Sequence, residues 1–262
     1  MELGELINLE GVKVVDSNIF SRHDGNSVLK KLYDCKSIQQ FPADLIFANF
    51  EISRNCRPYL KRNDVFSIPE VAEEMEYLLD KLNYSLAYFS SGKYQSFGNR
   101  YESVNNRRLV RLKRMNKHRE KQRIHREHGN EKDHLNILNN FAHEVSLIVK
   151  LLKNKEVTNS FTEEEKTNYD AYLGYFIHVA KREKLKNPSD SDTDEKLVSA
   201  AFTLANKDDV ILISSDVDIR NMIKFFHGDK KYRPIFNIGD VKKTVSLYAD
   251  PLREGYKRVL RI

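Results

Sequence analysis

Acidic side chains recur in this chain where an apolar segment ends or a helix begins. Asp16 and Asp216 follow short apolar runs, Asp218 comes two residues later, and Asp194 opens an apolar helical stretch. Carboxylates that gather in one place repel one another unless a cation binds between them. Carboxylate oxygens suit Mg²⁺ and Mn²⁺, ions that activate water and stabilise charge on a phosphodiester. The pattern therefore predicts a metal site with hydrolytic chemistry.

The hydrophobic pattern predicts the elements that would position these residues. Strands are expected over 12–15, 64–68, 84–90, 210–213 and 233–238. Helices are expected over 27–40, 41–52, 69–82, 103–128, 131–155, 162–186, 194–206 and 219–226, although 41–52 also suits a strand. Strands and helices alternate on both sides of a central stretch that has helical patterns only. This organisation predicts an α/β fold with an open, mostly parallel sheet flanked by helices and interrupted by an all-helical insertion. We place the α/β domain at 1–91 and 187–262 and the insertion at 92–186.

Four motifs in this order resemble those of the PIN-domain nucleases. They are Asp-Ser-Asn after the first strand, a Glu-rich helix start after Pro69, an Asp at the head of a small-residue helix, and Ser-Ser-Asp closing a later strand. The resemblance covers roughly 1–90 and 187–245. It implies a PIN-like sheet and an endoribonuclease that uses Mg²⁺ or Mn²⁺ to leave 5′-phosphate and 3′-hydroxyl ends, in RNA processing or decay.

The resemblance also implies which side chains do this work. The catalytic and metal-binding residues would be Asp16, Glu74, Asp194 and Asp216, with Asn18, Ser214 and Asp218 as accessory groups. The second acidic position has three further candidates, namely Glu70, Glu73 and Glu51. Glu70 and Glu74 share a helix face, so helical geometry permits either.

Several other interpretations compete with the metal site. Asp194, Asp216 and Asp218 could simply cap helices. A calcium loop starting at Asp190 is excluded, because its sixth position is Glu195 rather than Gly. Asp16-x-Asn18 lacks the second Asp of haloacid-dehalogenase phosphatases. Two functional alternatives stay open: a PIN fold that has lost catalysis and serves as an RNA-binding scaffold, and a structure-specific DNA nuclease.

Positive charge is concentrated in the predicted insertion. The whole chain carries +6, whereas residues 100–126 hold 11 Lys/Arg against 2 acidic residues, or +9, so the remainder is about −3. A helix polar on nearly all sides needs a partner, and phosphate is the natural one. We expect contacts to the backbone of structured RNA from Arg107, Arg108, Arg111, Arg114, Lys117 and Lys121. Alternatively, this segment serves assembly or a protein partner, and the helices 131–155 and 162–186 either pack on it or pair between subunits. His118, His125 and His128 fit a solvated or phosphate-facing role better than zinc binding.

Composition limits the setting. No apolar run approaches a membrane span, and the N-terminal residues lack the basic and apolar regions of a secretory signal. The two cysteines, Cys35 and Cys56, have no metal-ligand spacing. These features predict a cytoplasmic protein without a membrane partner.

Overall fold

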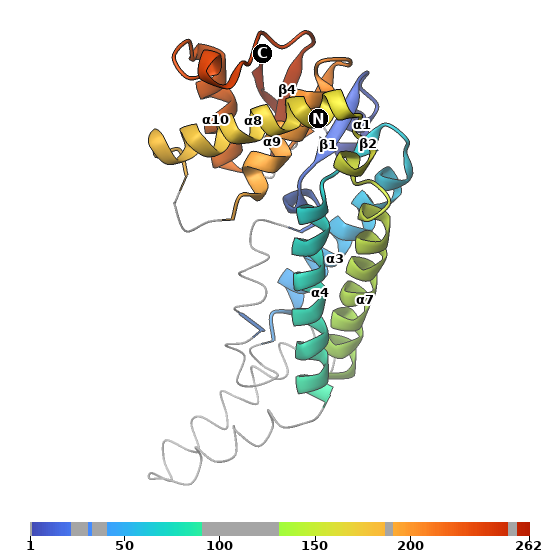
Figure 1. Ribbon diagram of the computed structural model, residues 1–262. Coiled ribbons are helices and arrows are strands. Elements are labelled where there is room, and N and C mark those ends of the chain that lie inside the picture. Colours follow the sequence, from blue (N-terminus) through green and yellow to red (C-terminus); the bar gives the residue numbers. More distant parts are fainter. Residues whose placement is uncertain (1, 22–30, 33–40, 91–130, 187–190, 251–255) are drawn as a thin grey trace, which may run out of the picture. The chain divides into compact units, whose positions relative to one another are not determined.

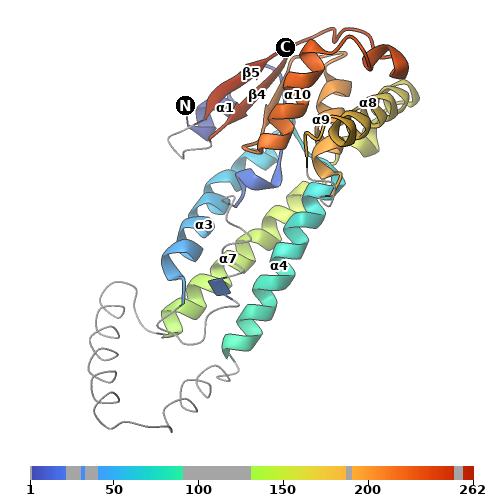
Figure 2. The ribbon, with the colours of Figure 1, turned by 90° about the vertical axis from the view of Figure 1, so that its left-hand side faces the viewer.

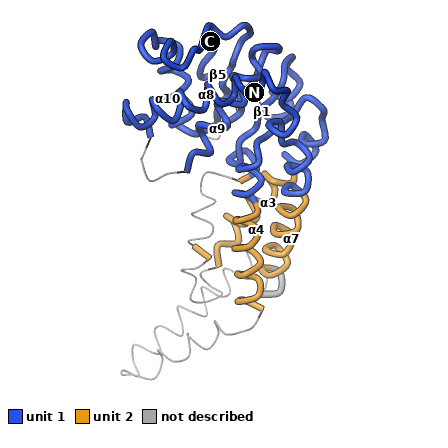
Figure 3. The backbone as a smooth tube through the Cα atoms, in the orientation of Figure 1, with its two compact units in different colours: residues 1–20, 56–75, 148–262 blue, residues 21–55, 76–147 orange. Residues whose placement is uncertain are grey.

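The computed structural model describes residues 2–21, 31–32, 41–90, 131–186, 191–250 and 256–262. They belong to two compact units (Figure 3). Unit 1 comprises residues 1–20, 56–75 and 148–262, and unit 2 comprises residues 21–55 and 76–147. Two long helices, α4 (Pro69–Ser90) and α7 (Glu131–Leu152), contribute residues to both units.

Unit 1 is built on a mixed, mostly parallel sheet with the strand order β2-β1-β3-β4-β5 within the described residues. β1 (Val12–Val15) runs parallel to β2 (Val65–Phe66) and β3 (Val210–Ile213), and β3 runs parallel to β4 (Val245–Ala249). β5 (Lys257–Arg261) is antiparallel to β4. Val15 pairs with Ile213, so β1 and β3 end level with each other. The predicted α/β class and mostly parallel sheet are confirmed.

Helices cover this sheet through small and aromatic side chains. α9 (Thr193–Leu204) contacts β1 and β3, and its buried Ala200 and Ala201 permit a close approach. α8 (Glu163–Arg182) and α10 (Val217–Gly228) pack on α9 (Figure 2). Rings from all three helices meet in one cluster, where the centroids of Phe202 and Phe226 are 4.6 Å apart. Shorter elements complete the unit: α1 (Leu3–Ile7), η1 (Ser17–Ile19), η3 (Arg57–Lys61), η5 (Val157–Ser160) and η6 (Arg233–Phe236).

The carboxyl-terminal part of the sheet differs from the sequence prediction. The strand expected over 233–238 is wrong, because Pro234 lies in the 3₁₀ turn η6 and Asn237 ends that turn with a positive φ of 56°. The sheet is instead extended by β4 and β5, which the sequence reading did not identify. Val245 and Leu247 are fully buried in β4, whereas β5 is largely exposed and reads as a polar segment.

Unit 2 contains the larger parts of three helices that run side by side, α3 (Ala43–Cys56), α4 and α7 (Figures 1 and 2). The strand expected over 84–90 is wrong, since α4 continues to Ser90. Its buried Leu82, Ser85 and Phe89 follow helical spacing. Phe41 packs its ring against Phe89, with centroids 5.4 Å apart. Although α4 and α7 have 22 residues each, no helix among the described residues is long and apolar enough to cross a membrane.

The boundaries between the two units differ from the boundaries of the insertion predicted at 92–186. Residues 148–186 belong to unit 1, because Tyr172, Tyr175 and Phe176 of α8 bury their rings against α9 and α10. Residues 21–55 belong to unit 2 with the long helices. The helix expected over 103–128 lies outside the described residues, together with the six basic residues expected to contact phosphate and the three histidines, as does most of the helix expected over 27–40.

Candidate metal centre

Asp16 ends β1 as a buried carboxylate surrounded by hydrogen-bond donors. It is 5% exposed and forms the N-cap of η1. Its Oδ1 accepts from the backbone N–H of Ser17 at 2.6 Å, and its Oδ2 accepts from Ser214 Oγ at 2.6 Å. Because β1 and β3 end level, Ser214, the residue after β3, reaches and hydrogen-bonds Asp16, the residue after β1.

The accessory residues predicted from sequence form the rest of this network. Asn18 donates from Nδ2 to Asp16 Oδ2 at 2.5 Å and to Ser214 Oγ at 3.1 Å, and its Oδ1 accepts from the backbone N–H of Ser215. Ser214 Oγ also accepts from the backbone N–H of Asp216 at 3.0 Å. Asn18 and Ser214 therefore orient Asp16 and fix the backbone that carries Asp216.

Among the candidates for the second acidic position, Glu74 is the one connected to Asp16. Ser17 Oγ donates to Glu74 Oε2 at 2.7 Å and contacts Asp16 Oδ1 at 3.3 Å. Glu70 instead forms an ion pair with Lys196 at 2.8 Å. Glu73 and Glu74 are both exposed, so the hydrogen bond from Ser17 rather than burial distinguishes Glu74. Glu51 belongs to unit 2, where it accepts from Arg54. Ser17, which bridges two carboxylates, was not singled out from the sequence.

Asp194, Asp216 and Asp218 form a tight acidic group at the beginnings of two helices. One carboxylate oxygen from each lies within 4.8 Å of the other two. Asp216 is also the N-cap of α10 and accepts from the backbone N–H of Asp218 at 2.7 Å. Capping therefore accounts for part of the role of Asp216. It does not account for Asp194, because the N-cap of α9 is Asp192.

Lys186 is a second residue of the site that the sequence reading missed. Its side chain is 5% exposed, and Nζ lies 2.9 Å from Asp194 Oδ2 and 2.8 Å from Glu195 Oε2. It also donates to the backbone carbonyl of Ser191. In the sequence, Lys186 is one of several basic residues after α8, and no local pattern distinguishes it.

The site holds negative charge at an energetic cost. Burial is the main cause that raises the pKa of Asp16 to about 7; the Ser214 hydrogen bond opposes it, and the charges of Asp194, Glu74 and Asp216 add to it. Burial likewise raises the pKa of Asp194 to about 6, against the stabilising effect of Lys186. A bound cation would favour the ionised form of both groups.

The chemistry of these donors fits a hard divalent cation. Three carboxylates and a nearby fourth match the oxygen ligands of Mg²⁺ and Mn²⁺. Opposite ligands of Mg²⁺ stand about 4.2 Å apart at its usual bond length of about 2.1 Å. The oxygens of Asp194, Asp216 and Asp218 lie within 4.8 Å of one another, so these side chains would have to move closer together to coordinate one Mg²⁺.

The arrangement brings together the four predicted acidic positions within unit 1. Asp194 and Asp216 share the acidic group with Asp218, and Asp16 and Glu74 are joined through Ser17. The charges of Asp194, Glu74 and Asp216 all act on Asp16. The roles of these residues in catalysis stay predictions. No family model, curated protein or solved structure matches the chain.

Proposed function

We propose that the chain is a metal-dependent endonuclease with a PIN-like site, which hydrolyses phosphodiester bonds in RNA. The observation that carries this proposal is the convergence of five carboxylates where β1 and β3 end together, from Asp16, Glu74, Asp194, Asp216 and Asp218. Carboxyl ends of parallel strands are where α/β sheets bind their ligands. The buried Asp16 carboxylate among them lowers the stability of the fold, a cost that a bound ligand would offset.

Each side chain has a task in this proposal. Asp194, Asp216 and Asp218 would hold Mg²⁺ or Mn²⁺, which when bound supplies an activated water and positive charge for the phosphate. Asp16 and Glu74, linked through Ser17, would orient that water and take up its proton. Asn18 and Ser214 keep Asp16 in place. Products with 5′-phosphate and 3′-hydroxyl ends follow from the PIN resemblance.

Asp-to-Asn substitutions at the acidic group test the proposal. We expect Asp194→Asn and Asp216→Asn to lower Mn²⁺-dependent cleavage of RNA by more than about a hundredfold, since even the outer partners of metal ligands cost up to that factor. Asp240→Asn is the matched control, because Asp240 is 96% exposed and pairs only with Arg233 among the described residues. Undiminished cleavage by both site variants would refute the assignment. Cleavage of single-stranded RNA and DNA measured in parallel decides the nucleic acid.

One observation favours an alternative in which the site has lost catalysis and the protein is an RNA-binding scaffold. The ammonium of Lys186 already neutralises Asp194, where a metal would bind. Calorimetric titration of the wild-type protein with Mn²⁺ separates the two functions. A nuclease must show saturable binding that Asp216→Asn weakens, whereas a scaffold without a metal site shows no binding heat.

A further inference from the structure

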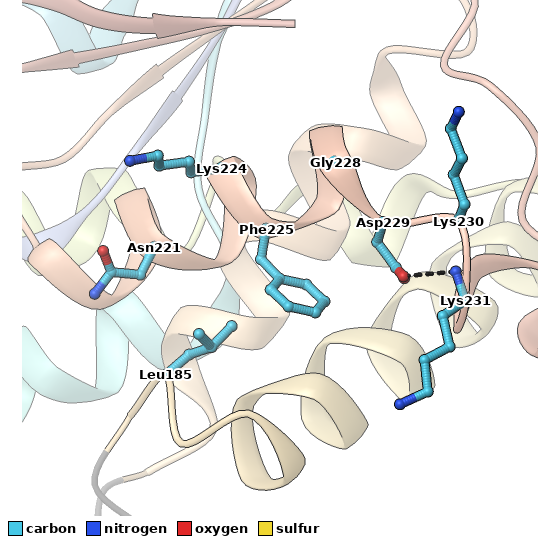
Figure 4. Close-up of a pocket in the computed structure, with 8 residues that line it drawn as sticks. All are labelled: Leu185, Asn221, Lys224, Phe225, Gly228, Asp229, Lys230 and Lys231. Atoms are coloured by element: carbon cyan, nitrogen blue, oxygen red, sulfur yellow. Dashed lines mark hydrogen bonds between the residues drawn. The ribbon is translucent and has the colours of Figure 1, made fainter.

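A groove outside the acidic site follows α10 toward its carboxyl end (Figure 4). It has a volume of about 770 Å³ and is lined by α10, the turn that follows it and Leu185 after α8. Phe225 presents its ring on the wall of the groove, and Lys224, Lys230 and Lys231 also line it. All of these residues belong to unit 1.

One face of α10 connects this groove to the acidic group. Asp218, Asn221 and Phe225 are spaced three and four residues apart, which places them along one side of the helix. Asp218 belongs to the acidic group, and Asn221 and Phe225 line the groove. The rise from Asp218 to Phe225 is about 10 Å. A ligand that reaches the acidic group can therefore extend along this face into the groove.

Two lysines on the rim of the groove carry positive charge that no described ion pair neutralises. Lys224 and Lys230 are exposed and form no ion pair within the part of the chain that the structure describes. The pKa of Lys231 is raised mainly by its hydrogen bond to Tyr232; the negative charge of Glu183 also raises it, whereas the positive charge of Arg182 opposes this. The groove therefore attracts anions.

The acidic residue in the groove wall is engaged by the protein itself. Asp229 is 7% exposed. It accepts from Tyr175 Oη at 2.9 Å and from the backbone N–H groups of Lys231, Tyr232 and Arg233. Figure 4 shows its bond to the Lys231 amide. This carboxylate orders the turn after α10 and holds Lys230 and Lys231 at the rim.

An aromatic ring between lysines suits one kind of ligand in particular. Unpaired nucleotides stack a base on an aromatic side chain and place their phosphates on cations, whereas the bases of a duplex are covered by their neighbours. Phe225 is partly exposed, and Leu185 supplies further apolar surface beside it. The Asn221 amide offers both a donor and an acceptor to a base edge.

We propose that this groove binds an unpaired stretch of nucleic acid adjoining the phosphodiester held at the acidic group. A base stacks on Phe225, and flanking phosphates contact Lys224 and Lys230. That the bound strand is then cleaved rests on the proposed nuclease function. The inference itself says that the strand is unpaired where it binds the groove. RNA and DNA share the chemistry that the groove recognises.

Fluorescence anisotropy of the full chain with a labelled, unstructured pyrimidine RNA of about 12 nucleotides tests the groove. EDTA keeps metal and cleavage out of this measurement. Replacing both lysines (Lys224→Ala with Lys230→Ala) should lower the slope of log K against log salt by about 1.4, or 0.7 for each lost phosphate contact. Phe225→Leu should raise Kd about 5- to 150-fold through lost stacking, and Phe225→Tyr should restore binding.

Matched controls separate groove binding from a general loss of charge or structure. Lys61→Ala with Lys150→Ala removes two exposed lysines of unit 1 that do not line the groove, and its salt slope should equal that of the wild type. Unchanged circular dichroism melting of Phe225→Leu shows that its fold is intact.

The remaining arms compare single-stranded RNA, single-stranded DNA and duplex RNA of one sequence. Preference for single strands of either kind, lost in Phe225→Leu, supports the inference. Wild-type affinity for single strands in Phe225→Leu, or an equal loss of affinity for single strands and for the duplex, overturns it. Failure of the nuclease assay would not affect this result, since binding is measured without metal, and a failure of groove binding would leave the cleavage test standing.

Discussion

At the scale of single residues, burial strongly changes the ionisation of Asp16 on folding. Its pKa of about 7 lies well above the usual value near 4. The folded protein thus keeps a proton that the unfolded chain releases. The stability from this proton is fully present below about pH 4 and is lost as the pH rises through 7.

Replacing Asp16 by Asn should flatten the pH dependence of stability in the metal-free protein. In the wild type, ionisation of Asp16 should lower the free energy of unfolding by about 2 to 3 kcal/mol between pH 5 and pH 8, and the variant should lack this part of the decrease. Urea unfolding in EDTA at several pH values measures the difference. The exposed Asp240→Asn variant serves as control and should follow the wild-type curve. Identical slopes for Asp16→Asn and the wild type would contradict the assigned ionisation.

Lys186 occupies the place of a cation beside Asp194. We expect Lys186→Met to tighten Mn²⁺ binding about tenfold, because the competing ammonium is gone, and to destabilise the metal-free protein by about 3 to 5 kcal/mol, because two carboxylates lose their buried partner. Calorimetry and thermal melting measure the two effects.

Two variants define the specificity of this effect. Lys186→Arg keeps the charge and should retain wild-type affinity. Lys196→Met removes a lysine that pairs with Glu70 and Asp192 rather than with the acidic group, and it should leave Mn²⁺ binding unchanged. Weaker binding in Lys186→Met would mean that Lys186 supports the metal instead of competing with it.

At the scale of elements, helix ends stabilise the acidic group. α9 and α10 have 12 residues each, and Asp194 and Asp218 lie in their first turns. The positive end of a helix dipole favours a nearby carboxylate by about 0.3 to 1 kcal/mol. Two such ends partly offset the repulsion among Asp194, Asp216 and Asp218. The two helix starts therefore stabilise the clustered carboxylates even when no metal is bound.

The start of β1 depends on a glycine. Gly11 has φ of +106°, and a Cβ there would lie 2.5 Å from the carbonyl oxygen of Asp209. Val12 donates to the same oxygen at 2.8 Å, so the approach aligns β1 with β3. We expect Gly11→Ala to destabilise the protein by about 1 to 3 kcal/mol, measured by urea unfolding. Gly239→Ala meets no atom within 4 Å and should stay within about 0.5 kcal/mol of the wild type. Equal stability of both variants would contradict this role.

At the scale of the whole molecule, charge is divided unevenly along the chain. Residues 100–126 carry a net charge of +9, whereas the whole chain carries +6 because the remaining residues sum to −3. Neutralising Arg107, Arg108, Arg111, Arg114, Lys117 and Lys121 to Gln should lower the salt slope of structured-RNA binding by about 5, at about 0.9 per phosphate contact on a duplex, and should raise KM. Anisotropy across a salt series measures the slope. An unchanged slope would assign this segment to assembly or a protein partner.

Much of the α/β frame could be predicted from local pattern. β1, β3 and the starts of α4 and α7 match their predicted positions, because each shows its own hydrophobic period or start signal. Prediction failed at 84–90 and 233–238, where the hydrophobic pattern suggested strands. In 84–90, packing on the helical face of α4 decided the structure, and in 233–238 the Pro234 turn did. β5 was not predicted because it has few apolar residues and becomes a strand only by pairing with β4.

The sequence by itself determined that Asp16 follows β1, that Asp216 follows β3 and that Asp194 opens α9, since strand ends and helix starts depend on neighbouring residues. Only the tertiary structure decided that Glu74 rather than Glu70 is linked to Asp16, that Lys186 neutralises Asp194, and that α8 belongs with the sheet. These outcomes join residues far apart in the chain, and strand register and helix packing set such distances. Local pattern carries no information about them.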